Sequence, residues 1–273
     1  MGTKIRPGPD PDFPFLNEYE SFDFPVPEEG LHSVIAVGGN LSPGMLLSAY
    51  EQGIFPWYSP GDPLLWQSPD PRFVIFRENL HISKSMKKVL RQKEFEIYLD
   101  RDFESVINNC ACITRPGQPG TWITEDMIEA YTGLHYLGWA HSAESYQSGR
   151  LVGGCYGIRL GKVFFGESMF ALVPNASKAA FITLASLLFA DETAFVDCQT
   201  PTDHLGSLGG QEINRDDFLT LLKKTLNERQ APNGVHYENY FLQRDKIDRR
   251  GNWNKLYQRT FIECIIQARI AHE

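Results

Sequence analysis

Cysteine is scarce in this chain: its 273 residues include five, and they are scattered. An odd number of scattered cysteines argues against a disulfide framework. Cys110 and Cys112 are close together, but no second pair follows at zinc-ligand spacing, so we expect no metal site. Long apolar runs are also missing, since no stretch reaches the ~18 apolar residues that span a membrane.

The N-terminal segment MGTKIRPGPDPDFPF lacks the apolar core of a signal peptide, so we expect a cytoplasmic protein without membrane contact. Positive charge is in deficit, with 26 Lys and Arg against 34 Asp and Glu and a net charge of −8. Such a balance disfavours a nucleic-acid partner unless a local basic patch overrides it. The hydrophobic content of 42% is ordinary for a globular protein, and the length allows one large domain or two modest ones.

Residues 151–199 form the most informative stretch. They read as a hairpin, a helix over 179–190 that is apolar nearly all round, and a third strand over 194–198. A crossover of this kind brings Glu167, Asp197 and Gln199 near the ends of neighbouring strands. One polar residue at a strand end usually caps a helix or faces water. Three of them beside apolar elements indicate a cleft or a paired cluster.

The remaining elements follow from local signals. Alternating Pro and aromatic residues over 6–30 predict an extended arm held by its rings against a neighbour. Ser42 and Pro43 predict a helix start, with Ser42 as the cap and Gly53 as the end. Trp66 and Trp122 read as loop rings, which either plug a core or form stacking platforms. Further predictions are strands over 31–37 and 139–146, a helix from Ser83, and helices over 102–111, 124–137 and 216–226.

The predicted helix from Ser83 carries a cluster of cations. Lys84, Lys87, Lys88 and Arg91 share one face, and no acidic residue interrupts the run from 84 to 93. Such a face is usually only solvated. In an acidic chain, this local reversal of sign favours contact with nucleic acid.

Several phrases resemble one family: VGGNLSPGMLLSAYEQGIFPWYSPGDPLLWQSPDPR, GTWIT, VGGCYGIRLGKVFFGESMFALVPNASKAA, VDCQ and HLGSLGGQEI. They are similar to leucyl/phenylalanyl-tRNA protein transferases over roughly residues 10 to 226. The resemblance implies an α+β fold, with a small N-terminal domain before a GCN5-related N-acetyltransferase-like (GNAT-like) mixed-sheet catalytic domain. We expect domains at 1–70 and 71–230. Residues 231–273 form a C-terminal extension without an assigned role, in which Leu256, Phe261, Ile265 and Ile266 suggest an amphipathic helix.

The resemblance also implies an activity: transfer of Leu, Phe or Met from leucyl-, phenylalanyl- or methionyl-tRNA to proteins that begin with Arg or Lys, marking them for N-degron degradation. It implies catalytic roles for Asp197, Gln199 and Glu167. Trp57 and Trp122 fall where the family holds the terminal adenosine and shapes the pocket. The implied aminoacyl pocket consists of Cys155, Phe164, Met169, Leu184 and Val196, and the implied tRNA contact is the cationic helix face.

Two positions depart from the family pattern: Cys155 stands where Met is more frequent, and Gln67 where an aromatic residue is common. An aminoacyl ester is already activated, so no enzyme nucleophile and no cofactor is expected, and we expect a monomer. The Gln199 carbonyl could accept a hydrogen bond from the attacking amine. Asp197 and Glu167 would then orient the amide and stabilise positive charge on the attacking nitrogen.

Other activities fit the sequence less well. An acyl-CoA acetyltransferase needs a Gly-rich turn for pyrophosphate, and residues 169–178 contain no Gly. A serine hydrolase could use Ser168 with Asp203 and His204, but a nucleophile elbow needs a small residue where Phe170 stands. A binding adaptor for basic N-termini without chemistry stays open until activity is assayed.

Overall fold

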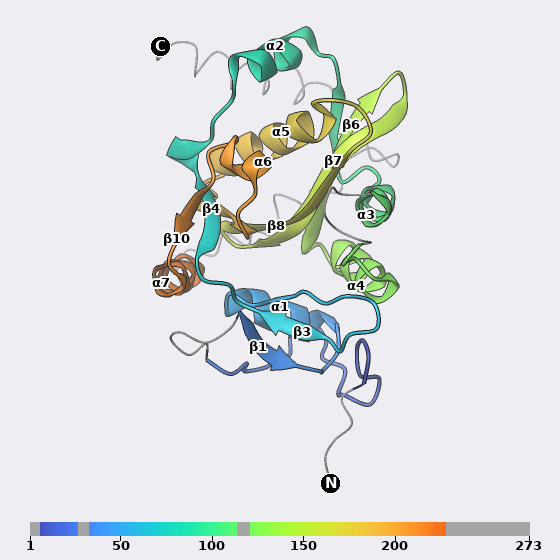
Figure 1. Cartoon of the computed structure of the whole chain (residues 1–273), viewed down its shortest axis with the longest axis vertical. Helices are drawn as coiled ribbons and strands as arrows, with labels where there is room; N and C mark the ends of the chain where they lie inside the picture. The colour runs from blue at the N-terminus through green and yellow to red at the C-terminus, as the bar shows by residue number, and fades with distance from the viewer. Residues whose placement is uncertain (1–5, 27–32, 114–120, 228–273) are drawn as a thin grey trace.

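The computed structural model describes residues 6–26, 33–113 and 121–227, so the predicted extension 231–273 and its helix lie outside the described residues. The fold is α+β, as predicted, with a small N-terminal unit beside a mixed sheet (Figure 1). The large sheet consists, in spatial order, of β10 (Gln211–Ile213), β4 (Arg72–Phe76), β9 (Phe195–Gln199), β8 (Val163–Ala171), β7 (Arg150–Leu160), β6 (Ala140–Gln147) and β5 (Glu96–Leu99).

The N-terminal unit contains a second, smaller sheet, in the order β1 (Val34–Val37), β3 (Leu65–Gln67) and β2 (Phe55–Pro56). The helices of the described residues are α1 (Pro43–Glu51), α2 (Lys84–Gln92), α3 (Phe103–Cys112), α4 (Glu125–Tyr136), α5 (Ala176–Ala190), α6 (Asp203–Gly206) and α7 (Arg215–Asn227), with a short 3-10 turn at Arg77–Asn79.

The aromatic arm lies along α1. Backbone N–H groups of the arm donate to side chains of the helix and its flanks, at Leu16 to Ser42 (3.1 Å), Phe22 to Ser48 (2.9 Å) and Phe24 to Gln52 (3.0 Å). The predicted helix start, with Ser42 at the cap and Pro43 in the first turn, is confirmed. Ser42 does occupy the cap position, but its Oγ serves the arm and makes no cap bond.

Most predicted helices are confirmed within one to three residues at their ends, whereas several strands were not foreseen. Trp66 is not a loop ring, because it lies in β3 with 1% of its surface exposed and fills the core. The unforeseen strands β5 and β10 are short and partly polar, so alternation gives little signal. The unforeseen β4 begins with a buried arginine, which masks an otherwise apolar strand.

A fork opens between β8 and β9. These strands pair in parallel only where Val163, Phe164 and Phe165 face Phe195, Val196 and Asp197, and α5 connects them. Beyond that point β8 continues to Ala171 beside β7, while β9 stays paired with β4. The two strands therefore separate at the level of Glu167 and Gln199.

A β-bulge lies on the β8 side of the fork. Tyr156 pairs with Ser168 and the next residue, Gly157, pairs with Gly166, so the register skips Glu167. The extra residue changes which side chains point to which face. In a regular strand, two residues five positions apart point to opposite faces. The extra residue instead puts Phe165 and Phe170 into the same cluster.

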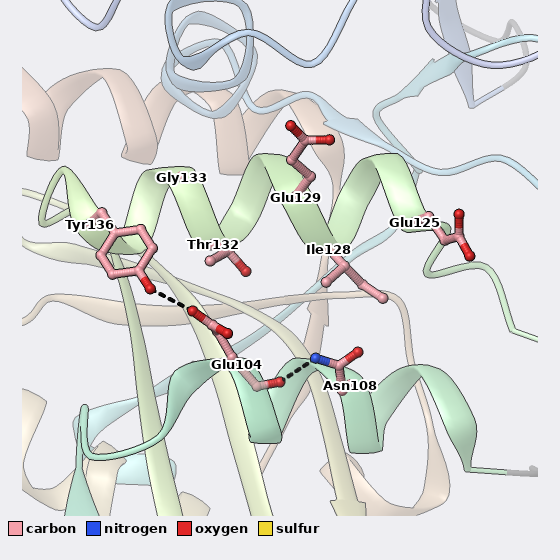
Figure 2. A pocket seen from close by; sticks show the side chains of 8 residues that line it. All are labelled: Glu104, Asn108, Glu125, Ile128, Glu129, Thr132, Gly133 and Tyr136. Atoms are coloured by element: carbon pink, nitrogen blue, oxygen red, sulfur yellow. Dashed lines mark hydrogen bonds between the residues drawn. The ribbon is translucent and has the colours of Figure 1, made fainter.

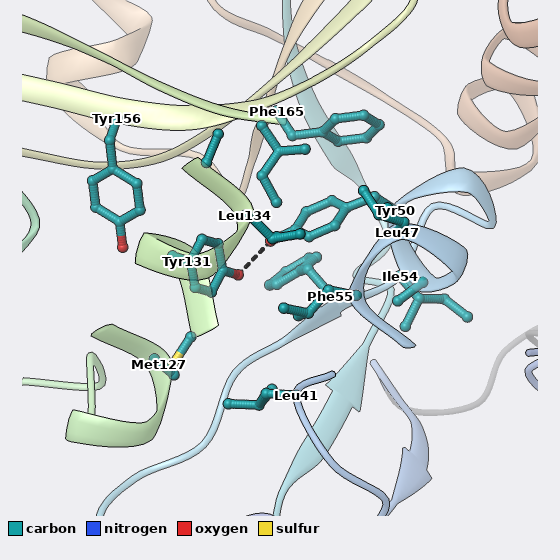
Figure 3. Close-up of a cluster of buried hydrophobic side chains, with 14 of the residues drawn as sticks. Leu41, Leu47, Tyr50, Ile54, Phe55, Met127, Tyr131, Leu134, Tyr156 and Phe165 are labelled. Atoms are coloured by element: carbon teal, nitrogen blue, oxygen red, sulfur yellow. Dashed lines mark hydrogen bonds between the residues drawn. The ribbon is translucent and has the colours of Figure 1, made fainter. Parts of the chain in front are cut away.

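The large sheet buries a different layer on each face. One layer packs against α5 and α2 and includes Phe164, Leu184 and Val196. The other packs against α1, α3, α4 and α7 and includes Tyr50, Tyr131 and Phe218 (Figures 1 and 3). We call these layers the α5 face and the α4 face. Among the described helices, none combines the length and apolarity that crossing a bilayer requires.

Candidate active site at the β8–β9 fork

Gln199 and Glu167 bridge the fork. The Nε2 atom of Gln199 donates to Oε1 of Glu167 at 2.7 Å, and the residues are 7% and 8% exposed. The prediction that these residues meet at neighbouring strands is confirmed. The bond also determines the orientation of the Gln199 amide, because its nitrogen must point to Glu167.

The backbone of Gln199 is left-handed, with φ at 64°. This conformation is unusual for a residue with a long side chain and costs on the order of 1–3 kcal/mol. It is held by Asp197, whose Oδ1 accepts the Gln199 backbone N–H at 2.9 Å. Among the described residues, no donor reaches Oε1 of Gln199, so this carbonyl can accept a further hydrogen bond.

Asp197 is paired with an arginine that the sequence analysis missed. Arg72 donates from Nε to Oδ1 at 2.9 Å and from its terminal nitrogen to Oδ2 at 2.6 Å, and both side chains are fully buried. The guanidinium lies between the rings of Phe55 and Phe218, at 4.9 and 4.5 Å from their centroids. Asp197 therefore reaches Gln199 through the backbone, and its charge is offset by Arg72 rather than left for a substrate nitrogen.

Glu167 is surrounded by hydroxyl groups. Its Oε1 accepts from Tyr50 at 2.7 Å and its Oε2 from Tyr131 at 3.1 Å. Burial raises the pKa of Glu167 to about 7, although the hydrogen bonds from Tyr50, Tyr131 and Gln199 act in the opposite direction. Both tyrosines appear in the sequence as ordinary core residues of amphipathic helices, which explains why they were not foreseen.

The five implied pocket residues gather on the α5 face. Four are nearly inaccessible, and Met169, half-buried beside the fork, packs against them. Cys155 faces Met169 across the β7–β8 ladder. Burial raises the pKa of the Cys155 thiol far above its usual range, so this side chain acts as an apolar packing group.

The two tryptophans implied for the adenosine lie on the α4 face. Trp57 and Trp122 are half-buried and pack against the layer that contains Tyr50 and Tyr131. Gln67, one of the two departures, holds Trp57 in place by donating from Nε2 to the Trp57 carbonyl at 2.8 Å. A polar residue at this position therefore supports the tryptophan loop.

The cationic helix is α2. Its Ser83 cap accepts the Met86 N–H at 3.3 Å, and Met86 is buried in the α5-face layer. Lys84, Lys88 and Arg91 are exposed and Lys87 is half-buried.

A cleft of about 530 Å³ lies elsewhere, between α3 and α4 (Figure 2). It is acidic, and Tyr136 donates to Glu104 at its edge. None of the predicted site residues lines it; the lining residues are Glu104, Asn108, Glu125, Ile128, Glu129, Thr132, Gly133 and Tyr136.

Comparisons with known proteins agree with the resemblance seen in the sequence. Residues 74–223 match the family described as leucyl/phenylalanyl-tRNA protein transferase, and residues 39–70 match the N-terminal domain of that family. A transferase of this name from Syntrophus aciditrophicus is 55% identical over 199 residues, which cover 73% of this chain and 82% of the relative. One from Myxococcus xanthus is 50% identical over 206 residues, covering 75% and 88%.

A solved structure with partial similarity is a GCN5-related N-acetyltransferase-like protein from Streptococcus suis. It is 14% identical with a TM-score of 0.31, and the match covers 65% of this chain and 67% of that one.

Proposed function

We propose that this chain, which belongs to the leucyl/phenylalanyl-tRNA protein transferase family and is thus an aminoacyltransferase, uses Leu, Phe or Met as donor residues. The acceptors are proteins that begin with Arg or Lys, which the transfer marks for N-degron degradation. One observation carries the proposal: the Gln199 amide is held by Glu167 with its carbonyl oxygen available at the fork.

The reaction needs no additional energy source, because the aminoacyl ester of the tRNA is already activated. The α-amine nitrogen forms a bond to the ester carbon, the carbon–oxygen bond to the terminal ribose breaks, and the proton lost by nitrogen ends on the ribose oxygen. The amine has a reference pKa of roughly 7.7 to 8.0, so an appreciable fraction is neutral at physiological pH. Positioning the two reactants can supply most of the rate.

Gln199 aims the amine in this mechanism. Its Oε1 accepts one amine hydrogen and turns the nitrogen lone pair toward the ester carbon. Glu167 positions Gln199 through the side-chain amide, at 2.7 Å, and Asp197 does so through the backbone N–H, at 2.9 Å. Asp197 is therefore a positioning residue, since it is fully buried and cannot touch a substrate.

The donor side chain enters the fork in this proposal. Beyond Phe165 the strands β8 and β9 no longer pair, and Met169 lies half-buried there. A passage at this place would connect Gln199 to the apolar layer of the α5 face. Straight or γ-branched side chains suit such a slot better than Ile or Val, and one methyl group is worth about 1–3 kcal/mol.

The charge distribution suits two charged substrates. The cations of α2 would contact the tRNA backbone, while the acidic remainder attracts a basic N-terminus. The terminal adenosine would lie against Trp57 and Trp122. These substrates favour a cytoplasmic enzyme.

The test combines a donor panel with an acceptor panel. Leucyl-, phenylalanyl-, methionyl- and isoleucyl-tRNA are each incubated with matched peptides beginning with Arg, Lys or Ala, and the peptide mass is measured. We expect one added residue from the first three donors, on the Arg and Lys peptides alone. Unchanged masses in every reaction would refute the transferase.

A variant pair tests Gln199 itself. Gln199→Met preserves side-chain length and removes the carbonyl, so transfer should slow by at least tenfold, in keeping with the 10²–10³ range for one lost hydrogen bond at a reacting centre. Gln211→Met makes the same change at an exposed residue of β10 and should transfer normally. Equal rates in the two variants would exclude the assigned role.

A further inference from the structure

Three hydrogen-bonding groups meet on the α4 face, and one of them, Glu167, also accepts a hydrogen bond from Gln199. Tyr50 comes from α1, Tyr131 from α4 and Glu167 from the β8 bulge, and none is more than 8% exposed. Each group contacts the other two. Tyr50 lies 2.7 Å from Oε1 of Glu167, Tyr131 lies 3.1 Å from Oε2, and the two phenol oxygens are hydrogen-bonded to each other (Figure 3).

Proton counting distinguishes the two states of Glu167. The ring has three contacts, and each requires one proton. The phenols supply two. If Glu167 is ionised, one contact must bring two lone pairs together. If Glu167 is protonated at Oε2, that proton goes to Tyr131, the Tyr131 proton goes to Tyr50, and the Tyr50 proton goes to Oε1.

The protonated state also satisfies the rest of the carboxyl group. Oε1 then acts as a carbonyl that accepts from Tyr50 and from Gln199, each at 2.7 Å. Oε2 acts as a hydroxyl that donates to Tyr131. A buried polar group with all its hydrogen bonds made avoids a desolvation penalty of roughly 1–3 kcal/mol.

The surroundings support this state. The other titratable groups near the ring are Asp197, whose charge raises the pKa of Glu167, its partner Arg72, and Tyr156, whose ring centroid is 5.8 Å from that of Tyr131. Burial raises the pKa values of Tyr50 and Tyr131 well above the usual range, so the phenols retain their protons. Glu167 is therefore the member of the ring that titrates.

We propose that Glu167 works as a neutral acid, and that Tyr50 and Tyr131 are positioning residues that close a ring of three hydroxyl hydrogen bonds around it. The inference rests on the proposed function. An ionised carboxylate beside the acceptor would favour the ammonium form of the α-amine, which has no lone pair for attack. A neutral Glu167 holds the Gln199 amide without adding that charge. Because Tyr50 belongs to α1, the N-terminal unit takes part in the site.

Glu167→Gln gives a direct test, because the amide places a carbonyl acceptor and an NH2 donor where the neutral acid has its C=O and O–H, and it stays neutral at every pH. Transfer from leucyl-tRNA to an Arg peptide is measured in single turnovers between pH 6 and 8.5, in variant and wild type. The wild-type carboxyl ionises across this range. The ratio of variant to wild-type kcat/KM should therefore rise by on the order of tenfold or more. A ratio that stays flat or falls with pH overturns the proposal.

The role of the two phenols is tested through the alkaline limb of the pH profile, which is the range in which kcat/KM falls as Glu167 ionises. Tyr50→Phe and Tyr131→Phe each open the ring and remove the contact in which an ionised Glu167 would bring two lone pairs together, so the limb should move to lower pH while the maximal rate falls. Tyr156→Phe removes a neighbouring buried phenol outside the ring and should leave the limb in place. A limb that stays fixed in both ring variants removes their positioning role.

Infrared difference spectra make the test independent of activity. Wild type minus Glu167→Gln should show the C=O stretch of a protonated carboxyl at pH 6, and this band should disappear toward pH 8.5. Absence of the band at pH 6 would overturn the proposal that Glu167 is a neutral acid, whether or not the protein transfers leucine. A band without any leucine transfer would instead refute the proposed function.

Discussion

The two faces of the large sheet are built from the same strands and hold opposite chemistry. In β9, Val196 and Cys198 point to the apolar α5 face, while Asp197 and Gln199 point to the α4 face. The α5 face is held mainly by apolar contacts, with one buried hydroxyl, that of Ser145, donating to the Ala176 carbonyl of α5. The α4 face buries charged and polar groups, whose desolvation must be offset by pairing. The comparison shows that the face with the larger desolvation penalty, the α4 face, is the one that orients Gln199.

Removing Arg72 should have the largest effect, because Arg72→Met leaves Asp197 buried and unpaired. We expect a loss of about 3–5 kcal/mol in the free energy of unfolding, measured by urea denaturation. The matched control is Arg159→Met. Its partner Asp191 lies at the same 2.6 Å, but the Asp191 side chain is 36% exposed, so the loss should be nearer 1 kcal/mol. Similar losses would mean that burial of the acid does not matter.

The second prediction concerns Glu144, a buried residue of β6 on the α4 face. Its carboxyl accepts the backbone N–H of Asp102, the cap of α3. Burial raises its pKa from 4.5 to about 7, and the charge of Asp100 adds to this. The folded state therefore binds more protons than the unfolded state between these values. The contribution of Glu144 to stability is full below pH 4.5 and is lost as the pH rises to 7.

Glu144→Gln should accordingly remove on the order of 2–3 kcal/mol of the fall in stability between pH 5 and pH 8. Urea midpoints at the two pH values measure this difference. Exposed Glu129→Gln is the control and should keep the wild-type dependence. A Glu144→Gln protein with an unchanged slope would show that this carboxyl is ionised in the fold.

The third prediction concerns the outer surface beyond the α5 face, where α2 lies. Charge reversal of Lys87, Lys88 and Arg91 to Glu should weaken tRNA binding by about tenfold or more, make its salt slope shallower by about 2, and leave turnover at saturating donor unchanged. Reversal of the exposed Lys223 and Lys224 on α7 is the control. Equal effects per reversed charge would make α2 an ordinary solvated face.

The smallest expected effect is a change in donor preference. Cys155 is smaller than the Met that the family resemblance implies at this position, so the proposed slot on the α5 face should be deeper here and favour Phe over Leu. Cys155→Met should lower the ratio of kcat/KM for phenylalanyl- over leucyl-tRNA by several-fold, within the ~1–3 kcal/mol that one such group is worth. Cys110→Met, equally buried on the α4 face, should leave the ratio unchanged. A constant ratio in both variants would remove Cys155 from the pocket.

The sequence predicted what depends on near neighbours. The apolar helix between two strands, the cationic face of α2 and the meeting of Glu167 with Gln199 all follow from local patterns joined by one crossover. The pair of Arg72 and Asp197 joins residues 125 positions apart, through a strand that had not been recognised. Tyr50 and Tyr131 could not be told from core tyrosines, because only the folded arrangement brings their hydroxyls to one carboxyl.

The bulge gives β8 one residue more than regular alternation needs, and that residue is Glu167. Deleting Glu167 would restore regular alternation, so Ser168, Met169 and Phe170 would keep their partners on β7 and their faces of the sheet. The same deletion would remove the carboxyl that holds Gln199. The packing of this strand therefore does not require the bulge, whereas the site does.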